Sequence, residues 1–160
     1  SMWGGTSWAS NEGQADYWAA LKCMKRVLES EDNVAYVANI EVEPAATERC
    51  QAMHTTANEI ALCQRLAMAG KSLALVLGSL ANNTNLDFLT PDTKVVGRTN
   101  DNHPAAQCRL DTYFSGSLCN KDFNEDVSPI DPIRGNCIKR DGYSMGVRPL
   151  CWYKPGNDEI

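Results

Sequence analysis

Seven cysteines spread along 160 residues constrain the fold of this chain more than any other feature. None of them form a C-x-x-C pair, whereas structural zinc sites normally take their thiolates from such close pairs. Widely spaced cysteines are typical of disulfides, which form in oxidising compartments. We therefore expect a disulfide-stapled domain of a secreted or periplasmic (cell-envelope) protein, with reduced core cysteines as the alternative. The seven are Cys23, Cys50, Cys63, Cys108, Cys119, Cys137 and Cys151.

The number and spacing of the cysteines limit how they can pair. An odd number leaves one thiol over, and a segment upstream of residue 1 is a candidate to hold its partner. On one straight helix, Cys50 and Cys63 would lie about 20 Å apart, but a disulfide joins Cα atoms about 6 Å apart. These two cysteines can pair only if the helix breaks between them.

Composition excludes two classes of partner. Hydrophobic residues make up 43% of the chain and charged residues 22%, as in ordinary globular domains. The net charge is −5, and the basic residues form no block, so we expect no nucleic-acid partner. The longest apolar run, residues 72–81, is about half the length needed to cross a bilayer. It predicts a buried helix, so we expect no membrane span.

The pattern of apolar and turn residues predicts a mainly α fold in a single domain, residues 1–160. Residues 10–118 form its helical part and residues 119–160 a loop-rich tail, which Cys137 and Cys151 are placed to staple. Residues 1–9, with Trp3 and Trp8, are expected to be a loop, and residues 34–37 and 94–97 to be short extended pieces.

Three helical regions are expected in the helical part. The first spans residues 10–29, with Ser10 or Asn11 as its cap. Its core stripe has helical spacing and consists of Tyr17, Leu21, Met24 and Leu28. The second runs from Pro44 to about residue 80 and is expected to break or kink near Gly70. The third starts at His103-Pro104 and ends near residue 118.

Glu12 and Asp16 are the first candidates for chemistry. Their four-residue spacing places both carboxylates on one face at the start of a helix, where a cation would relieve their mutual repulsion. An acidic first turn also complements the helix dipole without any ligand. From spacing alone, the helix-terminus interpretation is the stronger one.

Two motifs give this pair a second interpretation. The segment from Asn11 to Asp16 reads N-E-x-x-A-D and resembles the segment of gluzincin zinc metallopeptidases that supplies the third zinc ligand. The segment from His103 to Arg109 reads H-P-x-x-x-x-R and is similar to an element of the CAAX-prenyl-protease and heat-shock membrane-protease group. The resemblance implies that Glu12 is a zinc ligand and that Asp16 orients a ligand histidine. It also implies that His103 stabilises the transition state, with Arg109 supporting that segment.

The chain departs from this family in one essential respect. Its two histidines, His54 and His103, are not part of an H-E-x-x-H helix, which supplies two zinc ligands and the general base in gluzincins. The spacing of His54 and Asn58 predicts only a surface hydrogen bond. We expect that the missing helix lies upstream and was cut away. A naturally degenerate protein is the alternative.

The leading hypothesis is therefore the C-terminal part of a secreted or periplasmic zinc metallopeptidase that hydrolyses peptide or protein substrates. The fold it implies is the helical C-terminal part of a metallopeptidase domain. This chain alone is expected to be inactive and to hold no zinc tightly, because zinc must polarise the carbonyl while a base deprotonates water. The competing hypothesis is a non-catalytic, disulfide-stabilised helical module for binding or structure, derived from a peptidase.

Overall fold

Helices carry the architecture of the chain, as the sequence predicts. No strand forms within residues 10–128 and 130–160, the residues that the computed structural model describes. The expected loop at residues 1–9 lies outside them. In chain order the helices are α1 (Glu12–Trp18), α2 (Met24–Leu28), α3 (Asn33–Val37), α4 (Pro44–Met53), α5 (Ala57–Ser79) and α6 (Ala106–Leu118). A π-helical turn, η1 (Ala19–Cys23), joins α1 to α2, and a 3-10 turn, η2 (Lys139–Asp141), lies in the tail.

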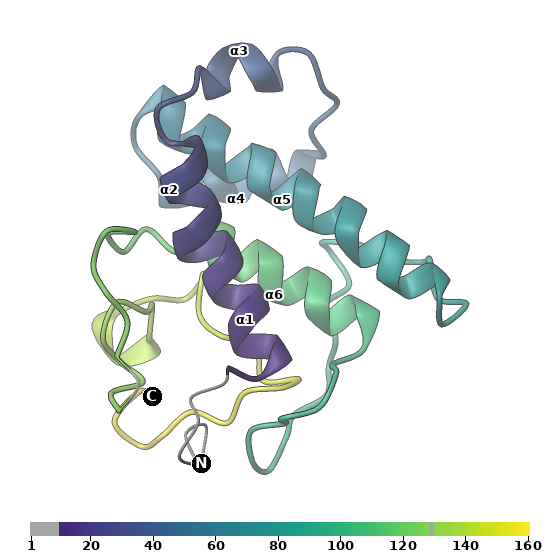
Figure 1. Cartoon of the computed structure of the whole chain (residues 1–160), viewed down its shortest axis with the longest axis vertical. Helices are drawn as coiled ribbons and strands as arrows, with labels where there is room; N and C mark the ends of the chain where they lie inside the picture. Colours follow the sequence, from purple (N-terminus) through teal and green to yellow (C-terminus); the bar gives the residue numbers. More distant parts are fainter. Residues whose placement is uncertain (1–9, 129) are drawn as a thin grey trace.

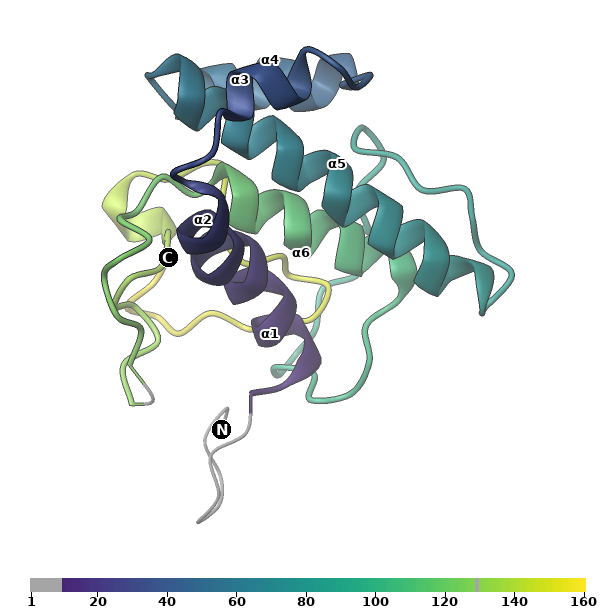
Figure 2. The same ribbon diagram turned by 45° about the horizontal axis from the view of Figure 1, so that its top comes forward.

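Helix α6 is the element around which the others are arranged (Figure 1). The long helix α5 packs along it, α4 packs against both, and α1 with η1 crosses α6 on another face (Figure 2). Two aromatic residues, Phe88 and Phe114, lie in the core shared by α4, α5 and α6, with their ring centroids 4.5 Å apart. This arrangement gives α6 buried contacts on several faces, which positions residues from its start beside α1.

A second core lies between α1, α6 and the tail, and two disulfides run through it. Cys108 pairs with Cys151, and Cys119 pairs with Cys137. The expectation that Cys137 and Cys151 staple the tail is therefore confirmed. A third disulfide links Cys50 to Cys63, and Cys23 is free and exposed. The three bridges indicate that the chain folds in an oxidising compartment.

The first helical region begins as expected but changes its pitch in the middle. Asn11 is the cap, and its side-chain oxygen accepts a hydrogen bond from the Gln14 N–H at 2.8 Å. At η1 the Met24 N–H bonds to the Ala19 carbonyl, five residues back. This wider turn shifts the buried stripe by one residue, so the expectation for Met24 is wrong: its exposure is 40%, while Lys25 is buried. The other three stripe residues are buried.

The second helical region breaks earlier than predicted. Helix α4 ends at Met53, His54 is extended, and α5 starts after Thr56, which forms a capping box with Glu59. This break allows the Cys50–Cys63 disulfide, whose Cα atoms lie 5.8 Å apart. No break occurs at Gly70, where the prediction placed one. Gly70 instead lets α6 approach closely, since a Cβ there would lie 2.6 Å from Cβ of Tyr113.

Two other expectations differ from the structure, and one expected extended piece forms no strand. Residues 33–37 form a helix rather than an extended piece, because the Asp32 side chain caps it by accepting from the Ala35 N–H. Helix α6 begins at Ala106, so His103-Pro104 precedes the helix instead of opening it. Residues 94–97 form no strand, although the Val96 N–H bonds to the Leu150 carbonyl at 3.0 Å.

Within the described residues, α5 is the one helix long and apolar enough to cross a membrane by length and composition. Core helices of soluble proteins meet the same criterion. Here α5 packs against α3, α4 and α6, and buried side chains line much of its length. Its place in this fold is that of a core helix.

Candidate active site

All four candidate residues lie together at the start of α1. Glu12 and Asp16 stand one turn apart on α1, His103 lies in the segment before α6, and Arg109 is in the first turn of α6. Because α1 crosses α6 near its start, residues about ninety positions apart in the sequence meet there. The helix crossing assembles this cluster, and neither motif could do so alone.

Arg109 and Asp16 form the centre of the cluster. The guanidinium donates two hydrogen bonds to the carboxylate, from Nε at 2.7 Å and from Nη2 at 2.8 Å. The Tyr113 hydroxyl donates to the same carboxylate at 2.8 Å. Both Asp16 oxygens are thus occupied, and the planar two-point pairing fixes the Arg109 side chain. Asp16 therefore binds an arginine and not the histidine that the resemblance implied. His103 contacts the Glu12 carboxylate instead.

Glu12 lies at the exposed edge of the cluster. One of its oxygens is 3.5 Å from Nδ1 of His103, and the other is 3.3 Å from Nη2 of Arg109. The Glu12 side chain is 39% exposed and that of His103 is 79% exposed. Two groups that bind protons or metals therefore face solvent side by side above a buried ion pair.

Burial and charge set the ionisation of the buried pair. Burial is the largest effect on Asp16 and raises its pKa above the ordinary value, whereas the hydrogen bonds from Arg109 and Tyr113 oppose the rise. Burial alone would lower the pKa of Arg109, but the bonds to Asp16 outweigh it and raise that pKa. The pKa of the Tyr113 phenol is also raised, first by burial and then by Asp16. Arg109 remains a cation and Tyr113 a neutral donor at physiological pH.

The backbone behind Glu12 is held by tight packing. A Cβ on Gly13 would lie 2.2 Å from the Trp152 indole, so the ring lies directly against the first turn of α1. Trp152 follows Cys151, whose disulfide partner Cys108 precedes Arg109. The Cys108–Cys151 disulfide therefore links helix α6, which carries Arg109, to the tail segment that carries Trp152. It holds the residues on both sides of the cluster in place.

The segment that carries His103 is anchored to the start of α1. The Asn11 amide donates to the Asp101 carboxylate at 3.0 Å, while the Asn11 oxygen caps the helix. Asn100 is fixed as well, because its N–H bonds to the Trp152 carbonyl at 2.7 Å. The motif asparagine thus performs two tasks: it starts the helix and it positions the histidine segment.

Three residues of the cluster were not predicted from the sequence to belong to it, namely Tyr113, Asp101 and Trp152. Tyr113 lies four residues after Arg109, and this helical spacing was a usable signal. Asp101 and Trp152 carry no comparable signal, since their roles depend on the path of two loops. The expected His54–Asn58 bond does not form, because α5 begins only at Ala57. His54 instead lies 3.1 Å from the Ser117 carbonyl, near the other end of α6.

One other grouping of metal-binding residue types occurs in the described part of the chain. It consists of Asp92, Cys108 and Cys151. Both sulfur atoms belong to a disulfide, so no thiolate is available there to bind a metal.

Comparison of the chain with protein-family models, curated proteins and solved structures finds no match.

Proposed function

We propose that this chain is the C-terminal part of a zinc metallopeptidase that hydrolyses peptide bonds in an extracellular or periplasmic compartment. The observation that carries the proposal is the meeting of Glu12, His103 and Arg109 at one exposed edge. The two segments that resemble the metallopeptidase motifs are far apart in sequence, and a chance likeness gives no reason for them to be neighbours in space. The disulfides support the compartment.

The residues at this edge fit part of a zinc site. Glu12 is the residue that would hold the ion, since its carboxylate is 39% exposed and faces solvent. When bound, zinc supplies polarisation of the scissile carbonyl and activation of a water molecule. The printed sequence contains no H-E-x-x-H segment, so the remaining ligands and the base have to come from residues outside it.

The other residues of the cluster position Glu12 and assist the substrate. Arg109 lies 3.3 Å from the Glu12 carboxylate and holds it in place through this ion pair. His103 is exposed enough to turn a ring N–H toward the oxygen of a substrate carbonyl as negative charge builds on it. Asp16 and Tyr113 hold Arg109 in place from the buried side of the cluster. Neither of these hydrogen bonds involves Glu12.

Zinc titration of the full natural protein tests this function. Glu12→Gln should weaken zinc binding at least about tenfold, the effect expected for disturbing one ligand of a site, and should abolish hydrolysis of a protein substrate such as casein. Glu41→Gln is the matched control, because Glu41 is exposed and lies outside the cluster. Unchanged zinc affinity in Glu12→Gln would remove Glu12 as a ligand.

One observation favours a second candidate function, a non-catalytic helical module for binding. The Glu12 carboxylate already lies close to two cationic or ionisable side chains, so its charge is partly compensated without a metal. The parent reading frame separates the two candidates. An H-E-x-x-H segment within roughly 50 residues upstream supports the peptidase, and its absence leaves the binding module.

A further inference from the structure

A second site lies near the end of α6 opposite to Arg109. A pocket of about 390 Å³ is lined there by residues of α2, the α4–α5 junction, the start of α5 and residues 120–123. This volume falls within the range of small-molecule sites. Five ionisable residues line it from different elements, namely Lys25, His54, Glu59, Lys121 and Asp122. None of the four candidate residues Glu12, Asp16, His103 and Arg109 lines this pocket.

Lys25 lines this pocket from α2. Its side chain is buried, with 4% of the residue exposed, because the π-helical turn η1 rotates it inward. Nζ donates to the Cys119 carbonyl at 2.7 Å. The neighbouring basic residues Lys22 and Arg26 likewise donate to carbonyls of Asp122 and Phe123. Unlike those two, Lys25 also lines the pocket.

The surroundings of Lys25 favour the neutral amine. Burial is the main cause and lowers the pKa of Lys25 to about 7, with a further lowering by the nearby charge of Lys22. The Glu59 carboxylate acts in the opposite direction but more weakly. At neutral pH a large fraction of this amine has a free lone pair, whereas an exposed lysine is almost fully protonated.

His54 supplies a proton acceptor in the same pocket. Its Nε2 lies 3.1 Å from the Ser117 carbonyl, which can only accept, so Nε2 carries the hydrogen. Burial is the main cause that lowers the pKa of His54 and keeps its ring neutral at pH 7, and Lys25 lowers that pKa further only when it is itself protonated. Nδ1 is then unprotonated and can take up a proton.

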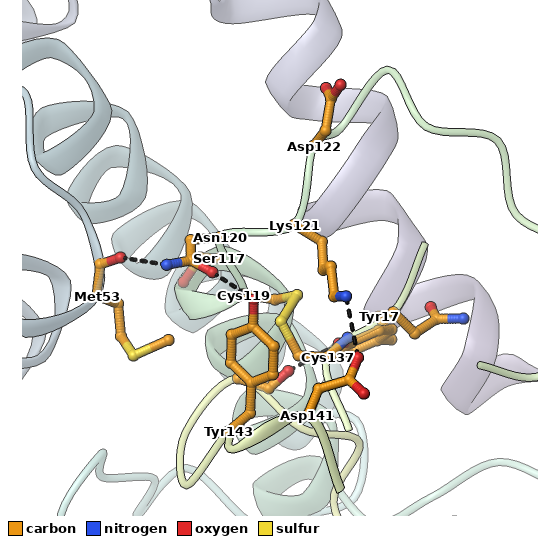
Figure 3. The surroundings of a disulfide bond; sticks show 12 residues. Tyr17, Met53, Ser117, Cys119, Asn120, Lys121, Asp122, Cys137, Asp141 and Tyr143 are labelled. Carbon is orange, nitrogen blue, oxygen red and sulfur yellow. Dashed lines mark hydrogen bonds and ion pairs between the residues drawn. A yellow bond between two sulfur atoms is a disulfide. The ribbon is translucent and has the colours of Figure 1, made fainter. Parts of the chain in front are cut away.

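Hydrogen bonds tie the rim of the pocket to its surroundings, and the lysine of this rim, Lys121, is already paired. In Figure 3 the Asn120 amide donates to the Met53 carbonyl, and the Tyr143 hydroxyl donates to the side-chain oxygen of Asn120. Lys121 points away from Met53 toward Asp141, with which it forms an ion pair at 3.0 Å (Figure 3). Lys25 bonds a neutral carbonyl and forms no ion pair in the described part of the chain, so it is the lysine of the pocket lining that remains available to a ligand.

We propose that this pocket binds a small aldehyde or ketone covalently, as an imine with Nζ of Lys25. The amine lone pair attacks the carbonyl carbon, and the carbonyl oxygen takes up the two amine hydrogens and leaves as water. His54 Nδ1 accepts a proton from the nitrogen and returns it to the departing oxygen. A carbon–nitrogen double bond replaces the carbon–oxygen double bond, and nothing is oxidised or reduced. Met53, Leu62 and Phe123 provide apolar contacts for the rest of the ligand.

Reductive labelling of the native chain with propanal and sodium cyanoborohydride tests the proposal. Mass spectrometry of tryptic peptides then gives the rate at which each lysine is modified at pH 7. Lys25 should react about tenfold faster than Lys94 and Lys139, which are exposed. Its rate should level off above pH 7, while theirs continue to rise. In 6 M urea the three rates should become equal.

A pocket-filling variant separates a binding site from a merely reactive side chain. Leu62→Trp should slow the labelling of Lys25 several-fold and leave Lys94 unchanged. Val76→Trp, on an exposed face of α5, is the matched control and should change neither rate. Native Lys25 reacting no faster than Lys94 and Lys139 overturns the proposal. This result would not affect the metallopeptidase proposal, whose residues lie elsewhere.

Discussion

The position of Glu12 depends on the absence of a side chain at the next residue, Gly13. Gly13 has no Cβ, and the Trp152 indole occupies the space where one would lie. Trp152 is fully buried, so it cannot move aside without disturbing the tail. The glycine in the N-E-G-Q-A-D segment is thus a packing requirement of the first turn of α1.

Gly13→Ala should destabilise the protein by about 1–3 kcal/mol, the usual cost of forcing extra volume into a packed core. Thermal unfolding followed by circular dichroism measures the loss as a lower Tm. Gly97→Ala is the matched control, since a Cβ there meets nothing within 4 Å. Equal Tm values for the two variants would contradict the packing at Gly13.

Arg109→Met should cost about 3–5 kcal/mol, because it leaves the Asp16 carboxylate buried without its cation. Urea denaturation gives this free energy. The double variant Arg109→Met/Asp16→Asn should recover part of the loss, since the buried charge is then gone as well. Additive losses in the double variant would show that the two side chains do not interact.

The sequence singled out four candidate residues because each lies in a short motif, and the structure brings these four together. The sequence could not predict their contacts. Asp16 holds Arg109 and Tyr113, and His103 contacts Glu12. These partners are set by the angle at which α1 crosses α6, and no local pattern encodes that angle.

Among the helices, the errors of prediction have local causes. The core stripe fails at Met24 because one π-helical turn adds a residue to the period, and the break falls at His54 because Thr56 forms a capping box. Gly70 misled the prediction for the opposite reason, since a glycine in a helix serves close packing as readily as bending.

The π-helical turn has a consequence for the pH dependence of stability. Below pH 7 Lys25 is charged in both the folded and the unfolded chain. Between about pH 7 and its ordinary pKa of 10.5 it is neutral when folded and charged when unfolded, so folding releases a proton and stability rises with pH.

Lys25→Met should remove this rise. The free energy of unfolding of the native chain, relative to the variant, should increase between pH 7.5 and 9.5 by up to about 1.4 kcal/mol per pH unit. Urea denaturation at the two pH values measures it, and titrations common to both proteins cancel in the difference. A difference independent of pH would mean that Lys25 stays charged in the fold.

Across the molecule as a whole, the three disulfides differ in what they hold. Cys50–Cys63 closes the α4–α5 turn, whereas Cys108–Cys151 joins α6 to the segment that packs behind Glu12. The loops they close span 13 and 43 residues. The longer loop constrains the unfolded chain more strongly.

Replacing Cys108 and Cys151 by alanine should cost about 4 kcal/mol, against about 3 kcal/mol for Cys50 and Cys63. It should also loosen Trp152 and thereby the start of α1. Hydrogen exchange of the Gln14 amide reports this loosening, because that N–H donates the capping hydrogen bond to the Asn11 side chain. Faster exchange only in the Cys50/Cys63 variant would contradict the assignment.

Two bridges, Cys119–Cys137 and Cys108–Cys151, together decide what happens when the chain is cut between residues 119 and 137. Residues 120–128 and 130–136 are irregular and largely exposed, and the segment begins and ends beside the Cys119–Cys137 bridge. A protease that nicks this segment leaves both pieces covalently joined, and both stay anchored in the core shared by α1, α6 and the tail. The nicked protein would migrate as one species on a gel until a reductant is added. In a compartment that contains other proteases, such a chain keeps its architecture after its surface has been cleaved.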